Sequence, residues 1–339
     1  MMQCEKCNLP KVSIIVPVYG VEKYIERCAR SLFEQTLDDI EYIFVDDCSP
    51  DKSIEILSNV LEQYPLRKDS VKIVRMQANS GIAAVRNYAI SFATGEYIVH
   101  CDSDDWIDRC AYKECYEFAK SNDYDIVFFD YDRTDGIKHK IDQRNIPSEK
   151  SALIGSLISG NVMGCLWGGC VRRKLYDVVE VYPQHNMCED LVFFIQLVNN
   201  AKRYGYIQKP YYKYFVSDGS ITSVKNKEKA IAIFHQAHAN INLVFEYLQR
   251  HNLSEHYVDE IEARKVTTIS CLLPYVNSDD VWLLWRSTYN LNFIEIGFNA
   301  NLSTYLRLMY ITLRVIPIMR RFMWLFFDIK SLINKKYLR

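Results

Sequence analysis

The run Cys101-Asp102-Ser103-Asp104-Asp105-Trp106 follows a short apolar segment, residues 97–99, that has the character of a β-strand. Carboxylates so close together repel one another unless a cation lies among them. Mg²⁺ or Mn²⁺ would suit this position, because such cations take oxygen ligands and combine one or two carboxylates with the phosphates of a substrate. The alternative is an acidic turn in which Asp102 and Ser103 cap a following helix. The surrounding sequence favours a metal site.

Upstream of this run, the chain alternates between the periodicities of strands and helices. Strands are predicted at 12–16, 40–45, 71–74 and 97–99, with helices between them at 21–32, 54–61 and 82–92. Repeated strand–helix units indicate an α/β fold with a mostly parallel sheet flanked by helices. Ligands bind at the carboxyl ends of the strands in such sheets. Polar side chains stand at these ends: Tyr19, Asp46, Asp47, Asn79 and Asp102 to Asp105.

The composition narrows the class of protein. The 339 residues are 49% apolar, which is enough to bury a sizeable core. A formal net charge of −1 argues against general nucleic-acid binding. The eleven cysteines are odd in number and scattered, so they do not indicate a disulfide framework, and we expect a reducing, cytoplasmic location. No run approaches the ~20 apolar residues that span a bilayer.

Taken in order, several segments resemble glycosyltransferase family 2. They are Val12-Ser13-Ile14-Ile15-Val16-Pro17-Val18-Tyr19, Val45-Asp46-Asp47-Cys48-Ser49-Pro50-Asp51, Asn79-Ser80-Gly81 with Arg86-Asn87, Gly95-Glu96-Tyr97, and Asp102-Ser103-Asp104-Asp105-Trp106. More loosely, Cys188-Glu189-Asp190-Leu191, Pro210-Tyr211-Tyr212-Lys213-Tyr214 and Gly219-Ser220-Ile221-Thr222 resemble its acceptor half. The resemblance implies the glycosyltransferase A fold. It also implies inverting transfer of a sugar from a nucleotide-diphosphate donor, usually UDP-linked, with Mn²⁺ or Mg²⁺ as the cofactor.

The donor side of the expected site follows the first four strands. A nucleobase needs a flat slot and an acceptor for its imide proton, which Pro17, Tyr19 and Asp47 could supply, although Asp47 could instead be an Asx-turn residue. The family pattern places the second aspartate of the pair, Asp47, opposite the uracil. The remaining donor-side roles also come from the resemblance: Asp46 and Asn79 beside the nucleotide, Arg86 near the base or diphosphate unless it is structural, Asp102 and Ser103 near the ribose, and Asp104 on the metal.

The acceptor side needs a carboxylate that takes the proton of the attacking hydroxyl. Asp190 is the first candidate and Glu189 the second; the alternative is that both only occupy the first turn of a helix and favour its dipole. Trp106 and Trp167 are candidate sugar-stacking residues for the acceptor, or else buried aromatics. Related chains often have Trp-Asn-Lys where this one has Trp167-Gly168-Gly169, and often place an arginine after the Tyr-rich segment, where this one has Phe215-Val216.

The expected organisation has four parts. An N-terminal extension, 1–10, precedes the catalytic domain at 11–225, whose nucleotide-sugar half is 11–130 and whose acceptor half is 131–225. A helical extension, 226–300, and a basic amphipathic tail, 301–339, follow. The tail carries eight cations against Asp328 alone, and it contains Pro317 and Trp324. We expect it to lie on the inner face of an anionic membrane, where a lipid-linked acceptor would be assembled; the alternative is packing on the protein's own core or on a second subunit.

The sequence thus favours transfer of a hexose or N-acetylhexosamine to a glycan or lipid-linked glycan in bacterial surface-polysaccharide synthesis. A nucleotidyltransferase would favour a glycine-rich loop with a cation after the first strand, where this chain has Pro17-Val18-Tyr19-Gly20. A dehydrogenase would need G-x-G-x-x-G at the same place. A degenerate sugar-binding or scaffold protein would have no chemical reason to keep Asp47, Asp104 and Asp190 together.

Overall fold

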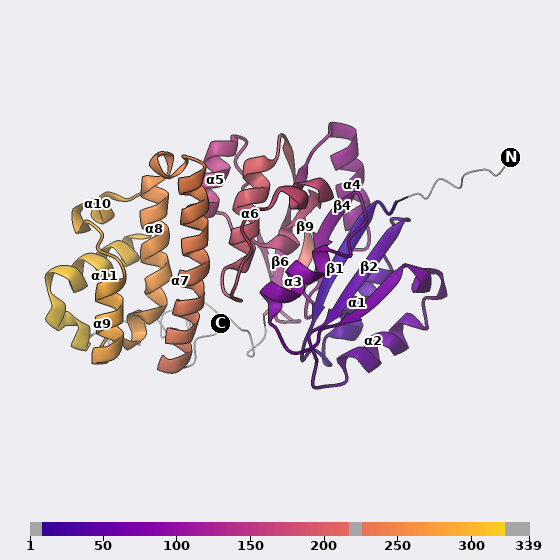
Figure 1. The fold of residues 1–339 in the computed structure, drawn as a ribbon, viewed down its shortest axis with the longest axis horizontal. Coiled ribbons are helices and arrows are strands. Elements are labelled where there is room, and N and C mark those ends of the chain that lie inside the picture. Colours follow the sequence, from indigo (N-terminus) through magenta and orange to yellow (C-terminus); the bar gives the residue numbers. More distant parts are fainter. Residues whose placement is uncertain (1–8, 217–225, 323–339) are drawn as a thin grey trace. The chain divides into compact units, whose positions relative to one another are not determined.

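The computed structural model describes residues 9–216 and 226–322. The contacts of the chain divide it into two units, one of Met1–Lys150 with Met163–Ser220 and one of Ser151–Val162 with Ile221–Arg339 (Figure 1). The sequence analysis placed residues 151–162 in the acceptor half. They group with the helical unit because Arg264 donates to the carbonyls of Ile158, at 2.5 Å, and Leu157, at 2.9 Å. The expected boundaries at residues 10, 225 and 300 stay predictions.

The first unit is built on a mixed sheet, and its first part follows the predicted strands closely. Strands β1, β2, β3 and β4 are parallel, whereas the next strand, β8, runs antiparallel to β4. The spatial order is β3-β2-β1-β4-β8-β6-β9-β5, with β7 paired to β6. The strands are β1 (Val12–Val18), β2 (Ile40–Asp46), β3 (Val71–Arg75), β4 (Tyr97–His100), β5 (Trp106–Ile107), β6 (Ile126–Thr134), β7 (His139–Asp142), β8 (Gly169–Arg172) and β9 (Tyr204–Phe215).

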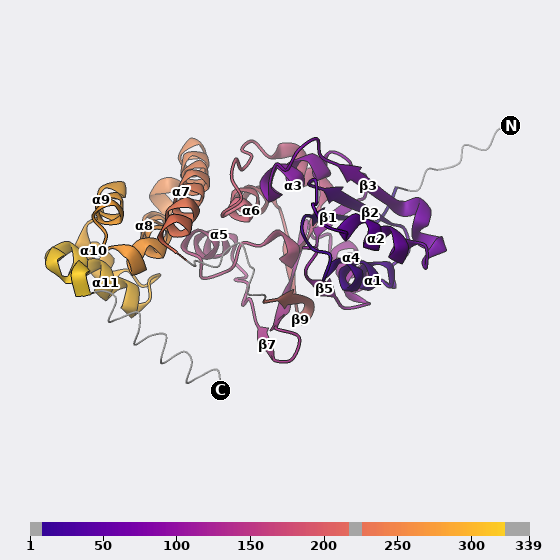
Figure 2. The ribbon, with the colours of Figure 1, turned by 90° about the horizontal axis from the view of Figure 1, so that it is seen from below.

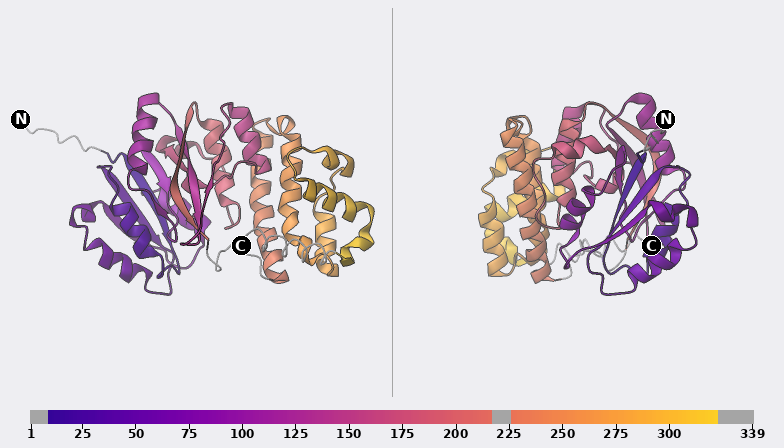
Figure 3. Two further views of the ribbon diagram at one scale, coloured as in Figure 1. Left: turned by 180° about the vertical axis from the view of Figure 1, so that it is seen from behind. Right: turned by 45° about the vertical axis from the view of Figure 1, so that its right-hand side comes forward.

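Helices cover both faces of this sheet, as expected for buried parallel strands. Alternate residues of β1, namely Val12, Ile14, Val16 and Val18, join a core with side chains of α1, α2 and α4. Helix α3 packs against β1 and β2 on the other side of the strands (Figures 2 and 3). The helices of this unit are α1 (Ile25–Phe33), α2 (Ser53–Leu61), α3 (Ile82–Ile90), α4 (Ala111–Asn122) and α6 (Glu189–Asn200), and α5 (Lys150–Ser159) begins at its edge.

A buried carboxylate fixes where β4 starts. The backbone N–H of Gly95 donates to Ser13 Oγ at 2.8 Å and to Glu41 Oε1 at 2.9 Å, and the Ser13 hydroxyl donates to the same Glu41 oxygen at 2.5 Å. A side chain at position 95 would place its Cβ 2.7 Å from the Ser13 nitrogen, so only glycine fits this close approach. The register of β4 against β1 in turn sets the position of the acidic run after β4.

The second unit contains α7 (Lys227–Arg250), α8 (Val258–Ile269), α9 (Asp279–Thr288), α10 (Phe293–Phe298) and α11 (Thr304–Val315). Its core includes Trp282 and Trp285, whose rings stack at 5.5 Å, and Met309, Tyr310 and Leu313 of α11. The burial of α11 side chains agrees with the alternative that this stretch packs on the protein's own core. Within the described ranges, no helix is both long and apolar enough to cross a bilayer.

Candidate active site

The loops after β1 and β2 are tied together by hydrogen bonds. The backbone N–H groups of Gly20, Val21 and Glu22 donate to Ser49 Oγ at 2.9 Å, Ser53 Oγ at 3.0 Å and Asp51 Oδ2 at 2.9 Å. Burial alone would raise the pKa of Asp51, but hydrogen bonds from Ser53 and Ser49 outweigh it and lower the pKa to about 2. The first two strand ends therefore form one fixed surface.

Asp46, the last residue of β2, and Asp47, the next residue, both accept hydrogen bonds from backbone N–H groups. Asp47 is 3% exposed, and its two carboxylate oxygens accept the N–H groups of Ser80, at 2.7 Å, and Gly81, at 2.8 Å. Asp46 accepts the N–H of Ser49 at 2.7 Å. Asp47 thereby joins the β2 end to the loop that begins α3, which is a link between distant segments and not the local Asx turn given as the alternative. Its contact with a nucleobase stays a prediction. Near these residues Pro17 is half-buried, while Tyr19 and Asn79 are exposed.

Arg86 of α3 is the centre of the site. Its side chain is 1% exposed, and Nη2 donates to Asp102 Oδ1 at 2.7 Å, while Nη1 donates to Glu189 Oε1 at 2.7 Å and to Asp190 Oδ1. The predicted donor residue Asp102 and the predicted base Asp190 thus share one guanidinium, although they lie far apart in sequence. Arg86 acts here as the counter-ion of three carboxylates, and its contact with the donor stays a prediction.

The charges of this cluster do not balance, since three carboxylates face one guanidinium. Burial and the neighbouring Asp190 charge raise the pKa of Glu189 far above its ordinary value. Burial also raises the pKa of Asp190, but the Arg86 charge opposes the shift, as does a backbone N–H from Leu166. Protonation of Glu189 relieves the repulsion, which leaves Asp190 as the ionised partner of Arg86. This asymmetry favours Asp190 over Glu189 as the base.

Helix α6 fixes the position of this carboxylate pair. Glu189 and Asp190 form its first turn, next to Cys188 with a φ of 62°. The N-terminal end of a helix favours negative charge, so the dipole would stabilise the ionised carboxylate that the predicted base role requires. Just before α6, the Asn186 amide occupies the space beside Gly81, where a Cβ would lie 2.4 Å from its oxygen. A glycine with a φ of 82° therefore lets the loop of α6 approach the start of α3.

In the acidic run after β4, Asp102 pairs with Arg86, whereas the residues that follow it have other partners. Ser103 is buried, and Asp105 is 1% exposed and accepts the N–H of Phe215 at 2.6 Å. Asp104 is half-buried, and its carbonyl accepts a hydrogen bond from Arg27 at 2.8 Å. Burial raises the pKa of Asp104 to about 6, and the charge of Asp102 adds to the shift. A backbone hydrogen bond and the charge of Arg27 oppose this shift without cancelling it, so the ionised form of Asp104 is only partly compensated.

In the described parts of the chain, no group of three or more His, Cys, Asp or Glu side chains is arranged to hold a metal ion. A cation bound together with a nucleoside diphosphate needs fewer protein ligands, because the phosphates supply the others. The under-compensated carboxylate of Asp104 fits this requirement, since a nearby cation would favour its ionised form.

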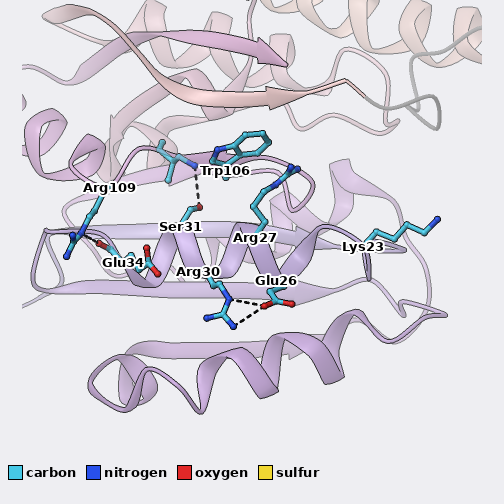
Figure 4. Close-up of a pocket in the computed structure, with 9 residues that line it drawn as sticks. Lys23, Glu26, Arg27, Arg30, Ser31, Glu34, Trp106 and Arg109 are labelled. Carbon is cyan, nitrogen blue, oxygen red and sulfur yellow. Dashed lines mark hydrogen bonds and ion pairs between the residues drawn. The ribbon is translucent and has the colours of Figure 1, made fainter. Parts of the chain in front are cut away.

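Trp106 stands in the wall of a cavity of about 600 Å³ between α1 and β5 (Figure 4). The Arg27 guanidinium lies 3.7 Å from the centre of the Trp106 ring and 4.6 Å from that of Phe215. Lys23 and Arg109 lie toward opposite ends of the same cavity (Figure 4). Because the Arg27 guanidinium lies against the Trp106 ring, less of the ring surface can contact a sugar. The acceptor role of Trp106 stays a prediction.

Trp167 is 4% exposed and stacks on Tyr212 at 4.4 Å. This placement favours core packing over sugar stacking. The adjoining Gly168 carbonyl accepts from Arg144 Nη1 at 2.5 Å, and a Cβ at Gly168 would lie 2.2 Å from that nitrogen. Burial raises the pKa of Asp190, and the charge of Arg144 opposes that rise alongside Arg86. A buried arginine from another segment therefore supplies positive charge next to the Trp-Gly-Gly sequence, where related chains often have lysine.

Sequence reasoning gave no role to Asp51, Asn186, Arg144 or Tyr212, although Asp51 and Tyr212 lie in segments that resemble the family. The Tyr212 hydroxyl accepts the N–H of Asp102 at 3.0 Å. Asp51 carried a local signal, because Ser49 and Ser53 flank it at the spacing of a helix cap. The other three act across long stretches of sequence. Their chemistry depends on pairings that no local motif encodes.

Several known proteins are similar to this chain in sequence. The family model described as Glycosyl transferase family 2 matches residues 13–178. An uncharacterized glycosyltransferase of Haemophilus influenzae is 30% identical over 226 residues, which cover 66% of this chain and 85% of that protein. A poly(ribitol-phosphate) beta-glucosyltransferase of Bacillus spizizenii is 44% identical over 120 residues, 34% of this chain and 18% of that one.

Among solved structures, S. aureus TarS 1-349 in complex with UDP-GlcNAc has a similar fold. Its TM-score is 0.55 at 21% identity, and the match covers 79% of this chain and 83% of that chain. The likeness confirms the predicted glycosyltransferase A type of fold, with a curled sheet flanked by helices and helices at the C-terminal end. On these matches and on its strand-end residues, the chain belongs to glycosyltransferase family 2.

Proposed function

We propose that this glycosyltransferase inverts the configuration of a sugar that it moves from a nucleoside diphosphate to a hydroxyl group. The donor is a UDP-hexose or UDP-N-acetylhexosamine, and the acceptor is a glycan or lipid-linked glycan of bacterial surface polysaccharide. The observation that carries the proposal is the buried Arg86, which joins the donor-side Asp102 to Asp190 on the acceptor side. The TarS complex with UDP-GlcNAc supports the uridine nucleotide, and the poly(ribitol-phosphate) beta-glucosyltransferase supports a cell-surface acceptor.

In the proposed reaction, Asp190 accepts the proton of the acceptor hydroxyl as its oxygen attacks the anomeric carbon. The bond between that carbon and the diphosphate oxygen breaks on the opposite face, and the diphosphate leaves with the electron pair. One glycosidic bond replaces one sugar–phosphate bond, with the configuration inverted. Arg86 keeps Asp190 ionised and oriented, and a proton on Glu189 limits the repulsion around it.

Asp104 is the residue that would hold a divalent cation, Mn²⁺ or Mg²⁺, together with the donor diphosphate. When bound, such a cation neutralises the charge that develops on the departing diphosphate. The protein then needs no general acid for the leaving group. Asp47 and the loops it fixes would hold the nucleoside.

The test is a donor screen. Purified full-length protein is incubated with UDP- and GDP-sugars and Mn²⁺, and both nucleotide release and sugar transfer are measured. We expect one UDP-sugar to dominate. Asp190→Asn should lower transfer by about 10²–10⁴-fold with UDP affinity within a few-fold of wild type. Asp177→Asn is the matched control, because Asp177 is exposed and its ion pair among the described residues is with the partly exposed Arg173.

Other outcomes would identify a different function. Turnover of Asp190→Asn close to that of wild type would refute the base assignment and direct attention to Glu189. UDP binding without turnover of any sugar would point to a sugar-binding protein, and release of pyrophosphate from nucleoside triphosphates would point to a nucleotidyltransferase.

A further inference from the structure

The basic stretch near the end of the chain is not explained by sugar transfer. Residues 301–322 contain four arginines and no aspartate or glutamate. This stretch belongs to the helical unit and forms α11 and the turn Pro317–Phe322. Part of it is structural, because Arg314 donates to the carbonyl of Tyr289 and Arg320 pairs with Asp279 at 2.6 Å. Arg321 is exposed.

Helix α11 is apolar on two faces. One face places Met309, Tyr310 and Leu313 in the core of the helical unit. The other carries Leu308 and Val315, which are 59% and 55% exposed. A spacing of seven residues puts these two side chains on the same side of a helix. An ordinary surface helix would carry polar residues there.

The exposed apolar face extends beyond α11. Helix α10 packs beside it, since a Cβ at Gly297 would lie 3.2 Å from Ile311 Cδ1. Ile311 lies between Leu308 and Val315 on the same side of α11. Next to Gly297, Phe298 is 83% exposed, and Ile294, one turn earlier in α10, is 58% exposed. After α11, Ile316 and Ile318 are 49% and 65% exposed. Together these residues form the apolar face of Ile294, Phe298, Leu308, Val315, Ile316 and Ile318.

We propose that this apolar face binds the surface of an anionic phospholipid membrane, with α11 lying in the headgroup region. The face carries exposed aliphatic and aromatic side chains, and its larger part lies in residues 301–322, which contain arginines and no acid. The acid of α10, Glu295, accepts a hydrogen bond from Asn292 at 2.9 Å. Such a surface matches a layer whose headgroups are negative and whose interior is apolar. A second copy of the chain suits the face less well. A two-fold interface would place the arginine-rich stretch of one copy against that of the other.

The test is co-sedimentation of the full chain with vesicles of equal parts phosphatidylglycerol and phosphatidylcholine. Leu308→Glu combined with Val315→Glu should weaken binding more than about tenfold, because it replaces apolar surface with negative charge. Arg321→Glu should weaken it by about fivefold or more. Leu66→Glu is the matched control, since Leu66 is 97% exposed on the other unit. Circular dichroism melting confirms that each variant is folded.

Binding should fall as the salt concentration rises and should be weaker on pure phosphatidylcholine. Equal sedimentation of wild type and the Leu308/Val315 double variant would overturn the proposal, as would wild-type sedimentation no greater than that of a soluble protein. A dimer that the double variant dissociates, with no vesicle binding by wild type, would show that a second copy is the occupant. The donor screen needs no membrane, so either proposal can fail without the other.

Discussion

Replacing Arg86 should make the stability of the protein depend steeply on pH. Arg86→Met removes the guanidinium and leaves a shorter, unbranched apolar side chain, so the buried Glu189 and the half-buried Asp102 and Asp190 lose their cation. Breaking a buried ion pair by removing one partner costs roughly 3–5 kcal/mol. Here the cost depends on pH, because the orphaned carboxylates can take up protons.

The sign follows from proton uptake. In the folded variant Asp190 loses the charge that opposed its upward pKa shift, so it stays protonated at a pH where the unfolded chain is already ionised. Stability is then greatest at low pH and falls as pH rises. Each such carboxyl contributes about 1.4 kcal/mol per pH unit, so moving from about pH 5.5 to about pH 8 should add about 3 kcal/mol to the loss.

Urea unfolding at the two pH values measures this difference. The control is Arg75→Met, because the Arg75 side chain is 69% exposed and, within the described parts of the chain, forms a single ion pair, with Asp46 at 3.4 Å. That substitution should cost less than about 1 kcal/mol at either pH. Arg86→Lys, which retains the charge, should lie between wild type and Arg86→Met. A loss for Arg86→Met that is the same at both pH values would refute the three-carboxylate account.

Three further predictions concern the same unit. Asp104→Asn should remove the enhancement of UDP binding by Mn²⁺ in calorimetry; an unchanged enhancement would show that the metal ligand lies elsewhere. The acid limb of kcat/KM against pH should lie above the ordinary aspartate pKa of about 3.9, since Asp190 must lose its proton and its pKa is raised. Gly168→Ala should displace Arg144 and lower the unfolding free energy by about 1–3 kcal/mol, whereas Gly155→Ala, which meets only a glutamate side chain, should not lower it.

The parallel half of the sheet could be predicted because its signals are local. The buried runs at 12–16 and 40–45 became β1 and β2, each longer by one or two residues. Of the polar residues after these strands, Asp47 contacts the loop that begins α3, and Asp102 contacts Arg86 of α3. The antiparallel β8 carried no such signal, because Gly169-Cys170-Val171-Arg172 begins with a glycine and contains a single β-branched residue, whereas the equally short β4 has Ile98 and Val99 in succession.

The roles of individual side chains were harder to predict, because they depend on distant partners. Arg86 was expected near the donor, yet it is enclosed by carboxylates, two of which lie about a hundred positions later in the chain. Tryptophan is a residue type that commonly stacks on sugars, which made Trp167 a candidate. Its burial against Tyr212 follows from how the sheet packs, and the sequence does not show that packing. In residues 301–322, the sequence shows the apolar residues of α11, but it does not show which face of that helix is buried. Trp324 lies outside the described residues.

The hydrogen bonds from Gly20, Val21 and Glu22 to the loop after β2 have a consequence for ligand binding. Loops that are already held in one conformation lose little conformational entropy when a ligand arrives. Association then needs no ordering step before contact, and its rate depends on diffusion and orientation alone. If nucleotides differ in their affinity for this surface, the difference should accordingly lie in their dissociation rate constants and not in their association rate constants.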